Sequence, residues 1–110
     1  MRVRSFQSRY EQTRTGDEAA RVDHVIDFPN HSRSYDQTRR AVRFWGHDSA
    51  MEASFFVTED ALKAIQPGAR FDEDGLLGTF DANRDLIYAA AAKVYARGRK
   101  GSYELISADF

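Results

Sequence analysis

Alternating apolar and polar residues in the middle of the chain predict a β-hairpin. Residues 41–46 (AVRFWG) and 51–57 (MEASFFV) alternate with the period of two that a strand with one buried face shows. A turn at Asp48-Ser49 gives the pairs Gly46–Met51, Trp45–Glu52 and Phe44–Ala53. One face would then carry Val42, Phe44, Ala53, Phe55 and Val57, and the opposite face Arg43, Trp45, Glu52, Ser54 and Phe56. We expect the first face to lie in the core.

Two helices are predicted after the hairpin. Thr58 suits the N-cap position, and the acidic residues that follow it lie where the helix dipole favours negative charge. The first helix should end before Pro67-Gly68, and a linker follows over residues 69–75. Apolar residues at helical spacing then predict one longer helix over about residues 74–97. Gly98 fits the left-handed position that ends many helices.

The remaining segments complete a small sheet. Residues 25–28 (VIDF) are predicted to be extended, residues 35–38 (YDQT) to form a turn, and residues 102–107 (SYELIS) to form a strand. The order strands, helix, helix, strand indicates an α+β fold with two layers and an antiparallel sheet of three to four strands. Residues 1–24 are polar and lack periodicity, so we expect a mobile tail before a single domain over residues 25–110.

Composition narrows the class of protein further. A chain of 110 residues has room for one domain, and its net charge of −1 gives no overall attraction to nucleic acid or to acidic membranes. The absence of cysteine excludes disulfides, thiolate metal sites and a cysteine nucleophile. The N-terminal residues contain no apolar segment typical of a secretory signal, and no stretch has the length of a membrane span. We therefore expect a cytoplasmic protein.

Several short motifs together resemble a known family. They are Phe28-Pro29-Asn30, Ser34-Tyr35-Asp36, the run from Arg40 to Gly46, Phe55-Phe56-Val57, Ala61-Leu62, Lys93-Val94-Tyr95, the run from Arg99 to Tyr103, and Ala108-Asp109-Phe110. This set, spread over residues 26–110, is similar to the small bacterial family known as domain of unknown function 1488 (DUF1488). The resemblance implies a fold of strands, two helices and a strand. It implies no activity, cofactor or catalytic residue.

Residues that could support catalysis do not form a recognisable site. His24, His31 and His47 fall in the tail or in loops, and no two of them have the i,i+4 spacing of helical metal ligands. His47-Asp48-Ser49 contains the residue types of a hydrolytic triad, but consecutive residues in a turn cannot connect nucleophile, base and acid in sequence. The acidic run at residues 72–75 (DEDG) lacks the ligand spacing of a calcium loop. We therefore expect a protein without enzymatic activity, cofactor or metal.

Basic residues offer one binding hypothesis. The turn at residues 98–101 (GRKG) lies after a helix, where the dipole disfavours anions, so capping of that helix is the simpler interpretation. If the fold gathers the nearby cations, an anion patch would consist of Arg40, Lys93, Arg97, Arg99 and Lys100. A nucleic-acid-binding accessory protein would use Arg39, Arg40, Arg43, Arg97, Arg99 and Lys100. We keep this as the alternative function.

The outer face of the hairpin offers the leading hypothesis. Trp45 and Phe56 lie on that face, and Ile106 joins them if Tyr103 and Leu105 point inward. An apolar patch on an uncovered sheet usually marks an interface. The candidate interface comprises Arg43, Trp45, Glu52, Phe56 and Ile106, and we expect Arg43 and Glu52 to pair between two copies across the rim of a two-fold dimer. The sequence therefore favours a protein-binding or regulatory module that associates with itself as a homodimer.

Overall fold

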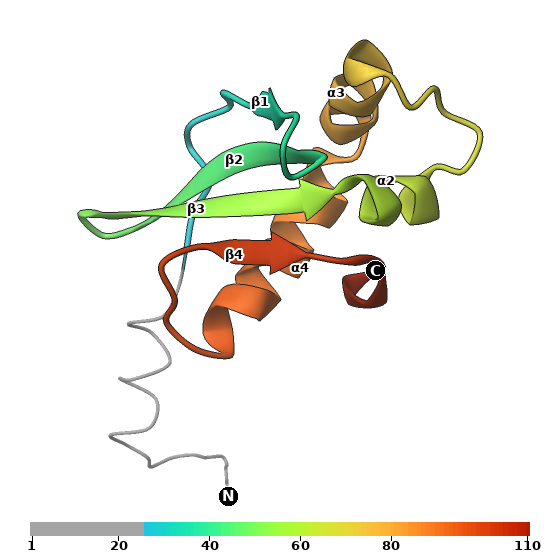
Figure 1. Cartoon of the computed structure of the whole chain (residues 1–110). Helices are drawn as coiled ribbons and strands as arrows, with labels where there is room; N and C mark the ends of the chain where they lie inside the picture. The colour runs from blue at the N-terminus through green and yellow to red at the C-terminus, as the bar shows by residue number, and fades with distance from the viewer. Residues whose placement is uncertain (1–25) are drawn as a thin grey trace, which may run out of the picture.

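A four-stranded sheet forms one layer of the protein, in a computed structural model that describes residues 26–110 (Figure 1). The strands are β1 (Ser34–Asp36), β2 (Ala41–Asp48), β3 (Met51–Thr58) and β4 (Tyr103–Leu105), and they lie in the order β1-β2-β3-β4. The first three strands pair antiparallel, whereas β4 runs parallel to β3. The expected α+β class is confirmed. The sheet is mixed and not antiparallel, because the helical connection returns the chain so that β4 runs beside residues 55–57 in the same direction as β3.

The hairpin has the predicted faces but a different register. Its turn is the two-residue loop Ser49-Ala50, in which Ser49 has a positive φ of 57°. The resulting pairs include Phe44–Phe55, Trp45–Ser54 and His47–Glu52. The predicted pairs were therefore wrong by two positions. A slip of two residues preserves the face on which each side chain lies, so both predicted faces are correct.

Three helices follow β3, and not the two that were predicted. They are α2 (Glu59–Ile65), α3 (Glu73–Ala82) and α4 (Arg84–Ala96). The predicted long helix is interrupted at Asn83, whose φ of −126° and ψ of 27° are not helical. The Asn83 side-chain amide donates to the Thr79 carbonyl at 2.8 Å, while its backbone N–H turns to the Phe80 carbonyl at 3.1 Å. The asparagine side chain thus takes the carbonyl that an unbroken helix would use.

The helix ends show which capping signals were correct. The Thr58 hydroxyl accepts a hydrogen bond from the Ala61 N–H at 3.1 Å, as predicted. Asp72 in the acidic run caps α3 by accepting from the Gly75 N–H at 2.9 Å. The left-handed conformation predicted for Gly98 is wrong, because no glycine among residues 26–110 has a positive φ. The chain instead leaves α4 through Arg97 in a right-handed conformation.

Two other expected segments differ in their bounds. Residues 34–36 form β1, so the turn predicted over residues 35–38 falls later, over residues 37–40. Asp36 stabilises that turn by accepting the Arg39 N–H at 3.0 Å, and Arg40 has a positive φ of 52°. At the C-terminus the strand is only three residues long, and the 3₁₀ helix η2 (Ser107–Asp109) follows it.

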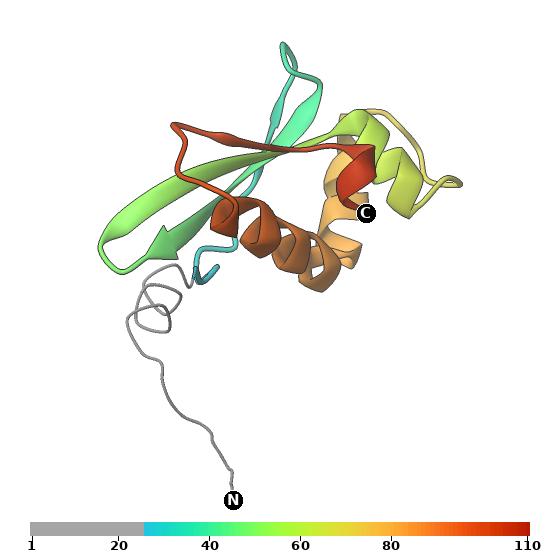
Figure 2. The same ribbon diagram turned by 90° about the horizontal axis from the view of Figure 1, so that it is seen from below.

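The core lies between the inner face of the sheet and the helices (Figure 2). Phe44 and Phe55 stack with ring centroids 5.3 Å apart, and Phe80 of α3 packs on Phe44 at 5.1 Å. Gly46 lets the segment before β1 approach the sheet, since a Cβ at this position would lie 2.8 Å from side-chain atoms of Ile26 and Phe28. The predicted tail over residues 1–24 lies outside the described residues.

Candidate functional site

The face of the sheet opposite the core carries no helix among residues 26–110, and we call it the outer face (Figures 1 and 2). Adjacent strands align Arg43, Phe56 and Glu104 across its centre, because Arg43 pairs with Phe56 in β2–β3 and Phe56 pairs with Glu104 in β3–β4. Paired residues project from the same side of a sheet. We call these three residues the central row. A cation and a carboxylate thus stand on either side of an aromatic ring.

Arginine side chains cover the aromatic centre of the outer face. The guanidinium carbon of Arg39 lies 4.1 Å from the Phe56 ring centroid, and that of Arg43 lies 5.5 Å from it. Arg43 also lies 5.2 Å from the Trp45 ring and donates to the Ser54 hydroxyl at 3.1 Å. Each exposed cation–π contact stabilises the arrangement by about 0.5–1 kcal/mol. The two guanidinium groups therefore form part of the outer face together with the aromatic rings.

The five candidate interface residues are not equally accessible. Ile106 is 47% exposed and Trp45 is half-buried, whereas Phe56 is only 5% exposed beneath the arginine side chains. Tyr103 and Leu105 point into the core as expected, which places Ile106 on the outer side. The apolar part of the face is thus smaller than the sequence predicted, and its centre is cationic and aromatic.

Glu52 lies elsewhere than predicted. It pairs with His47 near the hairpin turn, and its carboxylate is 3.5 Å from His47 Nε2. Within one chain Glu52 therefore lies beside His47, whereas Arg43 donates to Ser54. The pair expected between Arg43 and Glu52 would join two copies and stays a prediction. The two-residue register change moves Glu52 away from the position opposite Trp45.

A cleft opens beside β4, and we call it the basic cleft. It has a volume of about 560 Å³ and lies between β4, the end of α4 and η2. Its lining residues are Arg39, Val94, Arg97, Lys100, Ser102, Tyr103, Glu104, Ile106 and Asp109. Arg39 and Glu104 connect the cleft with the outer face. Three of the basic residues considered in the sequence thus meet at one place.

The other candidate cations lie in different surroundings. Arg40 pairs with Glu59 at 2.7 Å, and Lys63 lies 3.4 Å from the same carboxylate. Arg99 lies 3.7 Å from Asp48, on the side of α4 where Tyr95 is buried. Lys93 is exposed on α4 but does not line the basic cleft. Within residues 26–110, the residues of the predicted anion patch are therefore divided among several places.

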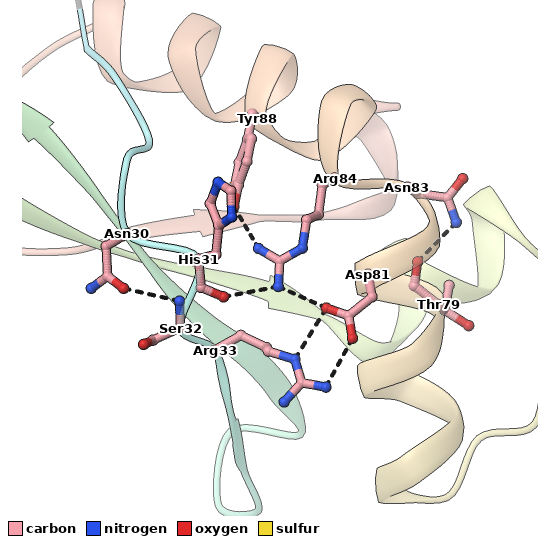
Figure 3. A network of polar contacts seen from close by, with 9 residues as sticks. All are labelled: Asn30, His31, Ser32, Arg33, Thr79, Asp81, Asn83, Arg84 and Tyr88. Atoms are coloured by element: carbon pink, nitrogen blue, oxygen red, sulfur yellow. Dashed lines mark hydrogen bonds and ion pairs between the residues drawn. The ribbon is translucent and has the colours of Figure 1, made fainter.

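A network of hydrogen bonds joins the segment before β1 to the α3–α4 junction (Figure 3). Arg33 donates two hydrogen bonds to the Asp81 carboxylate, at 3.1 and 2.8 Å. Arg84 donates to Asp81 at 2.8 Å, to the His31 carbonyl at 2.9 Å and to the Tyr88 hydroxyl at 2.7 Å. The Arg33 hydrogen bonds hold the pKa of Asp81 below its ordinary value. Arg33 and Arg84 thus join the segment before β1 to the α3–α4 junction, and we assign the network a structural role.

The histidines and the triad-like residues that were considered in the sequence lie in separate places. His24 lies outside the described residues, His31 is in the segment before β1, and His47 is in β2. Among residues 26–110, no three histidine, aspartate or glutamate side chains could hold a metal ion together. The triad-like residues sit at the hairpin turn, where Asp48 accepts a hydrogen bond from Tyr95 and not from histidine. In the same part of the chain, no helix is long and apolar enough to cross a membrane.

Sequence reasoning missed three features of the outer face: the hydrogen bond between Arg43 and Ser54, the alignment of Glu104 with Arg43 and Phe56, and the position of Arg39 over the Phe56 ring. The signal for Glu104 was present, because a residue between Tyr103 and Leu105 must face away from the core. The contacts of Arg39 had no signal, because they depend on the conformation of the β1–β2 turn.

Comparisons with known proteins agree on one family. The family described as "Protein of unknown function (DUF1488)" matches residues 26–106. A crystal structure of a DUF1488-family protein of unknown function from Shewanella loihica PV-4 has a TM-score of 0.65 and 17% sequence identity. That alignment covers 73% of this chain and 90% of the other. No curated protein matches the sequence.

Proposed function

Because this chain belongs to the DUF1488 family, whose description names no activity, we propose its function from its own geometry: a non-enzymatic protein-binding module that associates with itself through the outer face. The observation that carries the proposal is the central row of Arg43, Phe56 and Glu104. Such a row is complementary to itself. A homodimer is then the simplest assembly, since a two-fold axis brings the same patch of both copies together.

The charges of the row select one orientation of the two copies. A half-turn about an axis parallel to β3 places Phe56 over Phe56 and β2 of one copy over β4 of the other. Arg43 of each copy then lies opposite Glu104 of the other. An axis perpendicular to the strands would instead bring Arg43 against Arg43, and like charges in contact disfavour association. Sheets that pack face to face keep their strands within about 30° of each other, which the first orientation allows.

A charge-exchange experiment tests the proposal. Arg43→Glu and Glu104→Arg each place like charges opposite one another. Sedimentation should therefore give a higher dissociation constant of the dimer for each single variant than for the wild type. The double variant Arg43→Glu/Glu104→Arg exchanges the two charges and should recover association. Circular dichroism checks that each variant is folded. A wild type that sediments as a monomer at all concentrations, or a double variant no better than the single ones, contradicts the proposal.

Nucleic-acid binding is the second outcome that the same samples can reveal. Cations on a basic surface release counterions from nucleic acid, so binding of a mixed-sequence oligonucleotide would weaken steeply as salt is raised. Salt-dependent binding that is lost in Arg43→Glu would support nucleic acid as the partner of the outer face, in place of a second copy.

A further inference from the structure

We propose that the basic cleft binds a small organic anion, a phosphate or carboxylate that carries an apolar group. The cleft is complete within one chain, so this inference goes beyond the self-association proposed above. Its volume of about 560 Å³ lies in the range of about 300–1,000 Å³ that is typical of small-molecule sites.

The charges in the cleft favour an anion. Arg39 comes from the β1–β2 turn, Arg97 follows α4, and Lys100 comes from the loop before β4. Lys100 forms no ion pair within the described residues, and Arg39 has only a long contact of 3.6 Å to Asp36. Three cationic side chains of separate origin therefore line one space, and they outnumber the two carboxylates that line it with them.

Two carboxylates line the same cleft, and one of them is already engaged. Asp109 accepts the Ile106 N–H at 2.9 Å and lies 3.4 Å from Arg97. These contacts tie the Asp109 carboxylate back to Ile106, the residue before η2. Glu104 is exposed and forms no ion pair among residues 26–110. Removing its charge should therefore strengthen the binding of an anion.

The walls explain why the ligand should have an apolar part. Val94 and Ile106 line the cleft from opposite sides of β4, and Ile106 is 47% exposed. Tyr103 forms the floor, where its hydroxyl accepts the Lys100 N–H at 3.0 Å. An aliphatic or aromatic group would cover the exposed Ile106 side chain, which inorganic phosphate cannot do.

The end of α4 gives the cleft a further property. Helix C-termini carry partial negative charge, which opposes an anion. Binding must then come from the side chains and not from backbone N–H groups. The affinity should therefore depend strongly on Arg97 and Lys100.

Titrations followed by ¹H–¹⁵N NMR test the inference with four probes: phenyl phosphate, benzoate, inorganic phosphate and benzyl alcohol. Shifts should cluster at residues 97–106 with phenyl phosphate or benzoate, and the stronger of the two identifies the preferred anion. Inorganic phosphate should bind more weakly, and neutral benzyl alcohol should cause no such cluster. Equal shifts from benzyl alcohol and phenyl phosphate would overturn the proposal.

Variants decide whether the cleft itself is the site. Lys100→Gln and Arg97→Gln should each raise the dissociation constant of the better probe by about fivefold or more, as expected for loss of a charge-assisted contact. Glu104→Gln should tighten binding. Lys93→Gln removes the same charge from the exposed side of α4 and serves as the control, with no change expected.

Equal affinities for Lys100→Gln, Lys93→Gln and the wild type would refute the site. A mixed-sequence oligonucleotide that displaces the probe at far lower concentration would refute a small ligand.

Discussion

The hydroxyl of Tyr95 in α4 donates a hydrogen bond of 2.6 Å to the carboxylate of Asp48 at the end of β2. Both side chains are buried, and Arg99 lies 3.7 Å from the same carboxylate. Burial and the neighbouring Asp48 carboxylate raise the pKa of Tyr95, which keeps the hydroxyl protonated and able to donate. This contact attaches the end of α4 to the hairpin turn.

Tyr95→Phe should destabilise the protein because it leaves a buried carboxylate without its short hydrogen bond. Hydrogen bonds to charged groups contribute about 1.5–3 kcal/mol, and we expect a loss in that range in urea unfolding. Tyr35→Phe is the matched control, since the Tyr35 hydroxyl makes no hydrogen bond within residues 26–110. If both variants lost equal stability, the Tyr95–Asp48 contact would not be the cause.

The stacked phenylalanine pair should dominate the stability of the core. Phe44 and Phe55 are fully buried on the inner face of the hairpin. Phe44→Ala or Phe55→Ala should each cost about 3–5 kcal/mol in the free energy of unfolding. Phe71, which is 37% exposed before α3, provides the comparison. Phe71→Ala should cost much less, and a near-neutral result at Phe44 would contradict the assignment of the faces.

The network around Asp81 should make stability depend on pH in acid. Its folded-state pKa is lowered, so its contribution is complete above the ordinary aspartate pKa of about 3.9 and is lost as the pH falls through the lowered value. Asp81→Asn should therefore melt below the wild type at pH 7, and the difference should disappear at the acid end of this window. Asp85→Asn, an exposed change in the first turn of α4, should show no such convergence. A constant difference at every pH would assign the Asp81 effect to packing.

The sequence predicted the hairpin faces correctly because period-two patterning depends only on which positions are apolar. The register depends on the turn, and a two-residue loop with a positive φ at Ser49 had no glycine to signal it. The break at Asn83 is also local, yet the apolar spacing continues through α3 and α4 and so predicts one helix. Patterning thus locates faces well and helix breaks poorly.

The candidate site was predictable only in part for the same reason. Trp45 and Ile106 were assigned to the outer face by alternation, and both lie there with exposed surface. Phe56 was assigned to the same face correctly, but Arg39 and Arg43 lie over its ring, and Arg39 reaches it from a turn. The meeting of Arg39 with Arg97 and Lys100 depends on the parallel return of β4. Contacts between segments far apart in sequence leave no periodic signal.

Trp45→Glu should give a folded protein that associates more weakly. The indole lies on the outer face, away from Phe44 and Phe55, so the core should keep its packing. In the proposed dimer the second copy covers the half-buried Trp45 ring further. Each Å² of apolar surface that is removed from water contributes about 25 cal/mol to association. A carboxylate at this position cannot recover that contribution, and it would compete with Glu104 of the second copy for Arg43. Sedimentation over a range of concentrations measures the change, with circular dichroism as the folding check.

Met51→Glu is the control, because Met51 is exposed at the hairpin turn on the opposite side of the sheet, where a charge should not affect association. A Trp45→Glu protein that fails to fold would place Trp45 in the core, and equal weakening by Met51→Glu would move the interface to the hairpin turn.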